Sequence, residues 1–115
     1  AELPGEAAQS CLQLARALYS EAEILLVDDP FVSMEPERSE RVMEQCLKAV
    51  AQSKERTIIL ATQKLSVLVG VEQIVVLRNG TIFEQGDYKT LTSMPTEFSR
   101  MLLISRKKDA EQALK

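Results

Sequence analysis

The chain has 115 residues, a length that allows one domain at most, and 45% hydrophobic and 27% charged residues, which is the composition of a globular protein. Fourteen Lys and Arg residues against 17 Asp and Glu residues give a formal net charge of −3. This balance argues against nucleic acid as a partner, because nucleic-acid binders carry a basic surplus. The sequence has no histidine, which excludes histidine-based triads and histidine metal ligands.

Targeting and membrane signals are missing from the sequence as given. No stretch approaches the roughly 18–20 apolar residues that a membrane-spanning helix needs, and the first six residues do not read as a signal peptide. Cys11 and Cys46 are far apart and suit neither a disulfide framework nor a zinc site. We expect a soluble chain in a reducing, cytosolic setting.

The first half of the chain alternates predicted helices and strands. Apolar residues recur at helical spacing over residues 7–20 and 36–52, and Ser33 or Glu35 can cap the second of these helices. A continuous apolar run at residues 24–27 is typical of a strand buried on both faces of a parallel sheet, and residues 57–62 are expected to form a second buried strand.

The second half predicts a hairpin followed by helices. A short helix is expected at residues 65–69, and Asn79-Gly80, between strands at 73–78 and 81–84, is the strongest short hairpin signal because both residues accept positive φ. Helices are expected at residues 87–92 and 96–105. The second of these is expected to turn three apolar side chains inward: Phe98, Met101 and Leu102. Residues 106–115 form a charged tail that we expect to fray.

This order of elements predicts an α/β fold with parallel strands joined by crossover helices. A parallel sheet of so few strands leaves its edges open, so we expect it to be part of a larger sheet. Until that sheet is completed, one face or edge of the strands at residues 24–27 and 58–61 is expected to be uncovered and prone to self-association.

Two acids follow the first predicted strand. Four apolar residues followed by Asp28 and Asp29 form the pattern of a Walker B strand. In such a strand the first Asp holds Mg²⁺ through water, and the next acid polarises the attacking water. Ligands of open α/β sheets bind at this end of the strands. The same pattern also occurs where a strand simply ends in an Asx-type turn.

Neighbouring segments extend the pattern into a family resemblance. Residues 14–19, Leu-Ala-Arg-Ala-Leu-Tyr, and 24–31, Ile-Leu-Leu-Val-Asp-Asp-Pro-Phe, resemble the segment from the signature helix to the Walker B strand of ATP-binding cassette (ABC) proteins. Residues 57–63 resemble the strand before that family's switch histidine, and residues 74–86 its closing hairpin. The Asp-Asp-Pro-Phe form is most similar to the first nucleotide-binding domain of subfamily C, the multidrug-resistance type.

The resemblance implies a partial P-loop NTPase-like ABC core without its Walker A half. The sequence contains no G-x-x-x-x-G-K-[ST] phosphate loop. We therefore expect residues 1–105 to be the carboxyl-terminal part of a nucleotide-binding domain and residues 106–115 to be a charged tail. ATP and Mg²⁺ are the implied cofactors of the parent protein, and neither is expected to bind tightly to this chain alone.

The family's signature motif, Leu-Ser-Gly-Gly-Gln, corresponds to residues 3–9, Leu-Pro-Gly-Glu-Ala-Ala-Gln. Without gaps, Glu6 and Ala7 fall at the two glycine positions, and the Glu6 carboxylate would repel the γ-phosphate of a partner domain's ATP. With a one-residue insertion, Gly5 instead aligns with a glycine of the motif. The sequence does not decide between these two alignments. The resemblance implies that this segment faces the partner's ATP: Pro4, Gly5, Glu6, Ala7 and Ala8.

Four further positions take roles from the resemblance. Asp28 stands at the Mg²⁺ position, and Asp29 replaces the general-base glutamate with a side chain one methylene shorter. Gln63 stands where the switch histidine belongs and cannot carry its positive charge. Glu35 replaces the aspartate of the D-loop, within Val-Ser-Met-Glu. Together these departures predict a degenerate catalytic site.

The resemblance implies a transport ATPase at the cytosolic face of a membrane, with a second nucleotide-binding domain and the parent's transmembrane domains as partners. The alternative is a non-catalytic ABC-like module with a regulatory or dimer-contact role. A third interpretation is an unrelated small α/β fold that shares the strand-and-aspartate pattern by chance.

Overall fold

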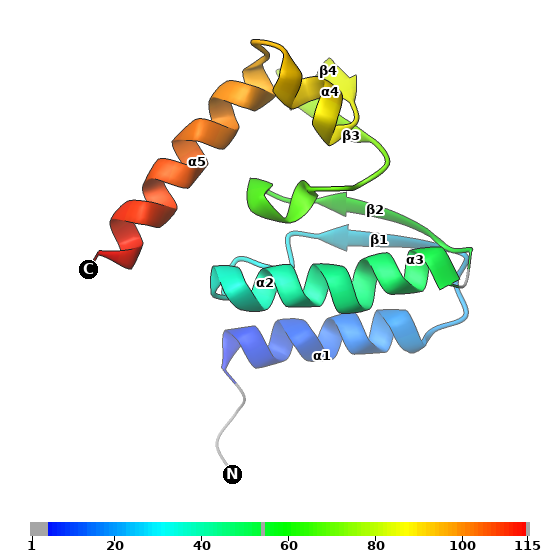
Figure 1. Cartoon of the computed structure of the whole chain (residues 1–115). Coiled ribbons are helices and arrows are strands. Elements are labelled where there is room, and N and C mark those ends of the chain that lie inside the picture. Colours follow the sequence, from blue (N-terminus) through cyan, green and yellow to red (C-terminus); the bar gives the residue numbers. More distant parts are fainter. Residues whose placement is uncertain (1–4, 54, 115) are drawn as a thin grey trace. The chain divides into compact units, whose positions relative to one another are not determined.

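The computed structural model describes residues 5–53 and 55–114 (Figure 1). The chain divides into two compact units, Ala1–Lys64 (unit 1) and Leu65–Lys115 (unit 2). Each unit has its own sheet and its own helices, so each is described by itself.

Unit 1 alternates helices with two strands, as the sequence predicts. Its elements are α1 (Glu6–Tyr19), β1 (Ile24–Asp28), α2 (Pro36–Val42), η1 (Met43–Lys48), α3 (Ala49–Ser53) and β2 (Thr57–Ala61). The elements α2, η1 and α3 follow one another directly, with η1 a π-helical stretch, and together they confirm the helix expected at residues 36–52. Strands β1 and β2 pair in parallel, from Ile24 opposite Thr57 to Asp28 opposite Ala61.

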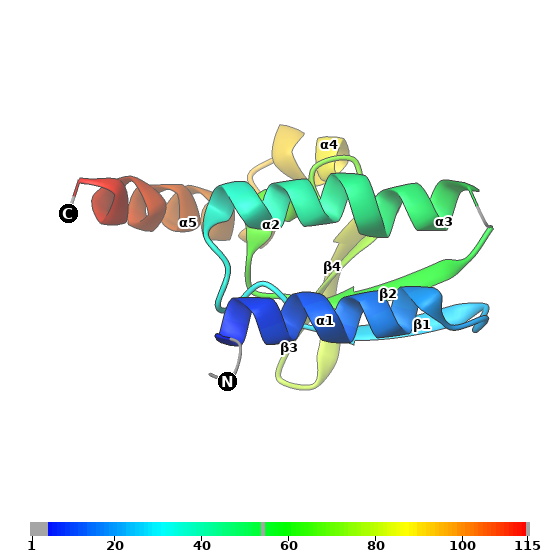
Figure 2. The ribbon, with the colours of Figure 1, turned by 90° about the horizontal axis from the view of Figure 1, so that it is seen from below.

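The described helices of unit 1 lie on one face of its two-stranded sheet. Figures 1 and 2 show α1 and the helical segment 36–53 on the same side of β1 and β2. On the covered face Leu25 is 6% exposed, whereas on the other face Ile24, Leu26 and Ile59 are 61%, 78% and 57% exposed. The expectation that these strands are buried on both faces is therefore wrong for this chain. The expectation of an uncovered face is confirmed.

The buried hydrophobic side chains of unit 1 come from the helices, from β1 and from the loop that follows it: Leu14, Leu25, Phe31, Met34, Met43 and Leu47. Arg56 adds a polar link between the start of β2 and the end of α1. Its guanidinium donates to the carbonyl oxygens of Leu18 at 2.9 Å and Ala22 at 2.8 Å. The last carbonyls of a helix have no partner within the helix, so the bond to Leu18 satisfies a group that α1 leaves open.

Unit 2 begins with a 3-10 turn and a hairpin. Its elements are η2 (Leu65–Leu68), β3 (Ile74–Arg78), β4 (Thr81–Gly86), α4 (Tyr88–Ser93) and α5 (Glu97–Ala113). Strands β3 and β4 are antiparallel, and Asn79 and Gly80 at their turn have φ values of +51° and +78°. The predicted hairpin is confirmed, with the positive φ values that the Asn-Gly pair favours.

One apolar cluster forms the core of unit 2, with members from η2, β3, α4 and α5: Leu65, Ile74, Val76, Leu91, Phe98 and Leu102. Tyr88 packs edge-on against Phe98, with ring centroids 6.0 Å apart. Met101, expected to point inward with Phe98 and Leu102, is 36% exposed. That expectation is wrong because the buried stripe of α5 is narrow and Met101 lies beside it.

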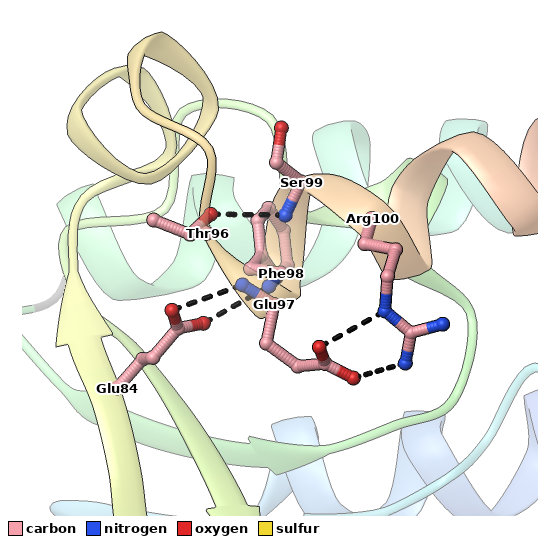
Figure 3. Close-up of polar contacts among 6 residues, drawn as sticks. All are labelled: Glu84, Thr96, Glu97, Phe98, Ser99 and Arg100. Carbon is pink, nitrogen blue, oxygen red and sulfur yellow. Dashed lines mark hydrogen bonds and ion pairs between the residues drawn. The ribbon is translucent and has the colours of Figure 1, made fainter.

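The start of α5 is capped from two directions (Figure 3). The two carboxylate oxygens of Glu84, on β4, accept hydrogen bonds from the backbone N–H groups of Glu97 at 3.0 Å and Phe98 at 2.9 Å. The Thr96 hydroxyl accepts from the N–H of Ser99 at 3.0 Å. Three of the first N–H groups of the helix are thus satisfied by side chains.

Helix α5 extends further than the sequence predicts. It runs to Ala113, across the boundary expected after residue 105, and Arg106 donates to the Tyr88 hydroxyl at 3.2 Å. The expected end at residue 105 is wrong because residues 106–113 contain no glycine or proline and are mostly strong helix formers. Within the described ranges, no helix combines the length and the apolar character that crossing a membrane requires.

Candidate functional site

The two consecutive acids lie where β1 ends, beside the end of β2. Asp28 is the last residue of β1, opposite Ala61, and it shares the exposed face of the sheet with Ile24 and Leu26. Its side chain makes no hydrogen bond or ion pair with any residue of the described part of the chain. An exposed, unpaired carboxylate at the carboxyl end of a parallel strand can bind a hydrated cation.

Asp29 lies in a different environment. Its backbone has φ +35°, in the left-handed region that residues other than glycine rarely adopt, and its N–H donates to the Ala61 carbonyl at 2.7 Å. Its carboxylate accepts from the Thr62 hydroxyl at 3.2 Å and from the Gln63 N–H at 3.3 Å. The structure therefore brings together Asp29 and Gln63, two of the predicted site residues, through the backbone of Gln63.

The residues between β1 and α2, here called the linking loop (residues 29–35), make two further contacts within unit 1. The Lys64 ammonium donates to the Met34 carbonyl at 2.8 Å, and the Ser33 hydroxyl donates to the Glu6 carboxylate at 2.8 Å. The Thr62 hydroxyl also accepts from the Lys64 N–H at 3.0 Å. Sequence reasoning missed Thr62 and Lys64. The only available signal was their position directly after an apolar strand, which does not reveal what their side chains reach.

The signature-like residues lie at the start of α1. Gly5 is the N-cap residue, with φ −63°, and Glu6, Ala7 and Ala8 form the first turn. A Cβ added to Gly5 would meet no atom within 4 Å, so the described part of the chain imposes no steric need for glycine there. Pro4 lies outside the described residues.

Glu35 is the N-cap residue of α2, and Pro36 follows at the first helical position, as expected. The Glu35 side chain makes no capping hydrogen bond. The backbone carbonyl of Glu35 accepts from the Ser39 N–H at 3.0 Å. The structure joins Glu35 to neither Asp28 nor Asp29 by a hydrogen bond, so its predicted place in a shared site stays a prediction.

A metal would have few protein ligands here. Among the described residues, no group of three or more His, Cys, Asp or Glu side chains is placed to hold an ion. Mg²⁺ commonly keeps several waters and binds through one or two carboxylates together with substrate phosphates. A single exposed carboxylate such as Asp28 fits that mode of binding and does not fit a closed, all-protein metal site.

Sequence comparisons with known proteins relate this chain to a family. Over 91 residues, 79% of this chain, the sequence is 34% identical to ABC transporter C family member 3 of Dictyostelium discoideum and 35% identical to ATP-binding cassette sub-family C member 2 of Homo sapiens. Bile pigment transporter 1 of Saccharomyces cerevisiae is 38% identical over 91 residues, 78% of the chain. The homologues of this chain are C-family ABC transporters.

The chain spans only 6% of the length of each of these three ABC relatives. No protein-family model matches it. The predicted resemblance to subfamily C is confirmed to this extent: the homologues of the chain are C-family ABC transporters. Which domain of such a transporter the chain represents stays a prediction.

Proposed function

We propose that this chain is the carboxyl-terminal part of a nucleotide-binding domain, the first of two, in a C-family ABC transporter. Its parent couples ATP binding and hydrolysis to transmembrane transport, with a second nucleotide-binding domain and transmembrane domains as partners. The observation that carries the proposal is the position of Asp28 and Asp29 at the carboxyl end of parallel strand β1, within a chain whose homologues are C-family transporters.

Each predicted site residue has a role in this proposal. Asp28 holds Mg²⁺ through water, Asp29 takes the general-base position, and Gln63 lies near the γ-phosphate. Residues 4–8 and Glu35 face the ATP of the partner domain. The exposed carboxylate of Asp28 supports the first of these roles, and the hydrogen bond between Asp29 and Gln63 supports their placement in one site.

One observation favours the alternative, a non-catalytic ABC-like module with a regulatory or dimer-contact role. Both carboxylate oxygens of Asp29 already accept hydrogen bonds, from Thr62 and from Gln63. A general base must reach the proton of the attacking water, and Asp29 is shorter than glutamate and turned toward β2. In this alternative Asp29 organises the ends of the two strands and removes no proton.

The first experiment measures the size of the native polypeptide, by denaturing gel and intact mass. The proposal predicts a product many times longer than 115 residues, as the 6% coverage of the relatives implies. A product of about 115 residues would contradict a role in ATP hydrolysis and leave an interaction role. The isolated chain is expected to bind Mg-ATP only weakly, and a dissociation constant near micromolar would overturn that expectation.

A second experiment separates the catalytic form of the proposal from the alternative. Asp29→Asn in the parent keeps the size of the side chain but removes the negative charge that a general base needs, so ATPase activity and transport should fall together. Glu111→Gln, an exposed substitution on α5, is the control. Unchanged ATPase activity and transport in Asp29→Asn would favour the non-catalytic module.

A further inference from the structure

Besides the backbone bond from Asp29 to Ala61 and the bonds of the Glu35 carbonyl with Ser39, side chains join the linking loop to other segments of unit 1 at three points. Asp29 joins it to the residues after β2, Ser33 joins it to the first turn of α1, and the Met34 carbonyl joins it to Lys64. Two of the three fastenings use the segment 62–64. The end of β2 therefore determines where the linking loop, and Asp29 with it, lies.

Lys64 contributes to this arrangement through two different atoms. Its backbone N–H donates to the Thr62 hydroxyl, which in turn donates to Asp29, while its ammonium donates to the Met34 carbonyl. Lys64 is half-buried, and Met34 is 5% exposed. Holding a long, flexible side chain in one place costs conformational entropy, and a hydrogen bond from a charged donor is strong enough to offset that cost.

We propose that Lys64 is a positioning residue that fixes the Asp29 carboxylate against Gln63 by clamping the linking loop to the segment after β2. A role for this clamp in ATP chemistry rests on the proposed function. The clamp itself is a property of unit 1. Without the Lys64 ammonium, the linking loop keeps its links at Asp29 and Ser33 and its buried side chains, but loses the hydrogen bond at the Met34 carbonyl. The Asp29 carboxylate then gains freedom to leave the Gln63 N–H.

The test is amide hydrogen exchange on the 115-residue chain, comparing Lys64→Met with the unmodified protein. Methionine keeps the apolar length of the side chain and removes the donor. Exchange at Gln63 and Met34 should become about tenfold faster, the effect expected from the loss of one charge-assisted hydrogen bond. Amides of the β1–β2 ladder should be unchanged. Lys64→Arg keeps a cationic donor and should restore slow exchange.

Lys108→Met, an exposed lysine on α5, is the matched control and should leave exchange in unit 1 unaltered. Unchanged exchange at Gln63 and Met34 in Lys64→Met would overturn the proposal. So would a uniform increase across unit 1, because a purely structural role raises exchange in the ladder as well.

If Lys64→Met does not fold, the same exchange measurement is made on Thr62→Val. It breaks the contact with Asp29 but leaves the bond between Lys64 and Met34, so the clamp should keep exchange slow at both Gln63 and Met34. A rise at either amide contradicts the clamp.

A readout in the parent separates this proposal from the proposed function. If the parent hydrolyses ATP, Lys64→Met should lower kcat more than it raises KM, because Asp29 is displaced while nucleotide contacts remain. A parent without ATPase activity would count against the catalytic form of the proposed function, while the exchange result would still decide the clamp.

Discussion

The two units of the chain differ in how completely they bury their apolar residues. Unit 2 surrounds one cluster with η2, β3, α4 and α5, and its central Phe98 is 1% exposed. Unit 1 covers one face of its parallel pair and leaves the other open, with Leu26 78% exposed. Unit 2 closes its own core, whereas the sheet of unit 1 has room for another layer.

This difference coincides with the distribution of the candidate site. The described residues to which the sequence assigns a catalytic, cofactor or metal role all belong to unit 1, and Asp28, Asp29 and Gln63 lie at the ends of its two strands. Parallel sheets are normally covered on both faces. The uncovered face of β1 and β2 is therefore what one expects of a segment from a larger α/β layer.

The largest expected effect tests whether the units fold independently. Phe98→Ala removes a fully buried ring from unit 2 and should lower the free energy of unfolding of that unit by about 3–5 kcal/mol. Amide spectra should then lose the dispersed signals of unit 2 and keep those of unit 1. Phe83→Ala, at a ring that is 49% exposed, is the control. Simultaneous loss of the unit 1 signals would show that the two units fold together.

The next effect breaks a polar link in unit 1. Arg56→Ala removes hydrogen bonds to the Leu18 and Ala22 carbonyls and should destabilise unit 1 by about 2 kcal/mol. Denaturant unfolding followed by amide spectra measures this change unit by unit. Arg38→Ala, at an exposed position on α2, should change stability much less. An equal loss in both variants would refute the special role of Arg56.

A comparable polar link in unit 2 joins β4 to α5. Glu84→Ala removes the acceptor of the Glu97 and Phe98 N–H groups and should cost about 1–2 kcal/mol, the usual range for a lost helix cap. Glu84→Gln keeps one acceptor oxygen and should cost less. Glu72→Ala, exposed in the loop before β3, serves as the control for removing an acid. Exchange at Phe98 that is no faster in Glu84→Ala would contradict the cap.

The open face of unit 1 gives a smaller effect on stability but a visible one on association. Leu26→Lys should change the free energy of unfolding by no more than about 0.5 kcal/mol, because the side chain is already exposed. It should also reduce self-association in sedimentation experiments. Leu25→Lys, one residue away on the covered face, should prevent unit 1 from folding. Association that is unaffected by Leu26→Lys would mean that another surface is involved.

The smallest effect concerns pH in unit 2. Hydrogen bonds from Thr90 hold the pKa of Asp87, the N-cap residue of α4, below its usual 3.8, and the hydrogen bond with Arg100 holds the pKa of Glu97 below its usual 4.5. Both carboxyl groups therefore stabilise the fold above these values, and the contribution is lost as the pH falls through the lowered pKa values. The protection factor of the Thr90 amide, the intrinsic exchange rate divided by the measured rate at the same pH, should fall below pH 3.8, and Asp87→Asn should abolish that change. A protection factor that stays constant across this range would contradict the prediction.

Most of the elements could be predicted from local patterns. Helical spacing located α1 and the segment 36–53, and the Asn79-Gly80 pair located the hairpin, because these signals depend on residues near one another in the chain. The end of α5 could not be predicted as well. The charged residues 106–113 suggest an unstructured tail by composition, although most of them favour a helix. The exposure of Met101 depends on how wide a stripe the rest of unit 2 covers, which the sequence of α5 alone does not contain.

The sequence by itself determined the order of the elements, the parallel pairing suggested by two apolar runs, and the identity of the acids at the end of β1. Only the tertiary structure decided that Asp28 is exposed while Asp29 is held by Thr62 and Gln63, and that Lys64 reaches the linking loop. The physical reason is distance along the chain. These contacts join residues about 30 positions apart, and the register of β1 against β2, which no local pattern encodes, brings them within hydrogen-bonding reach.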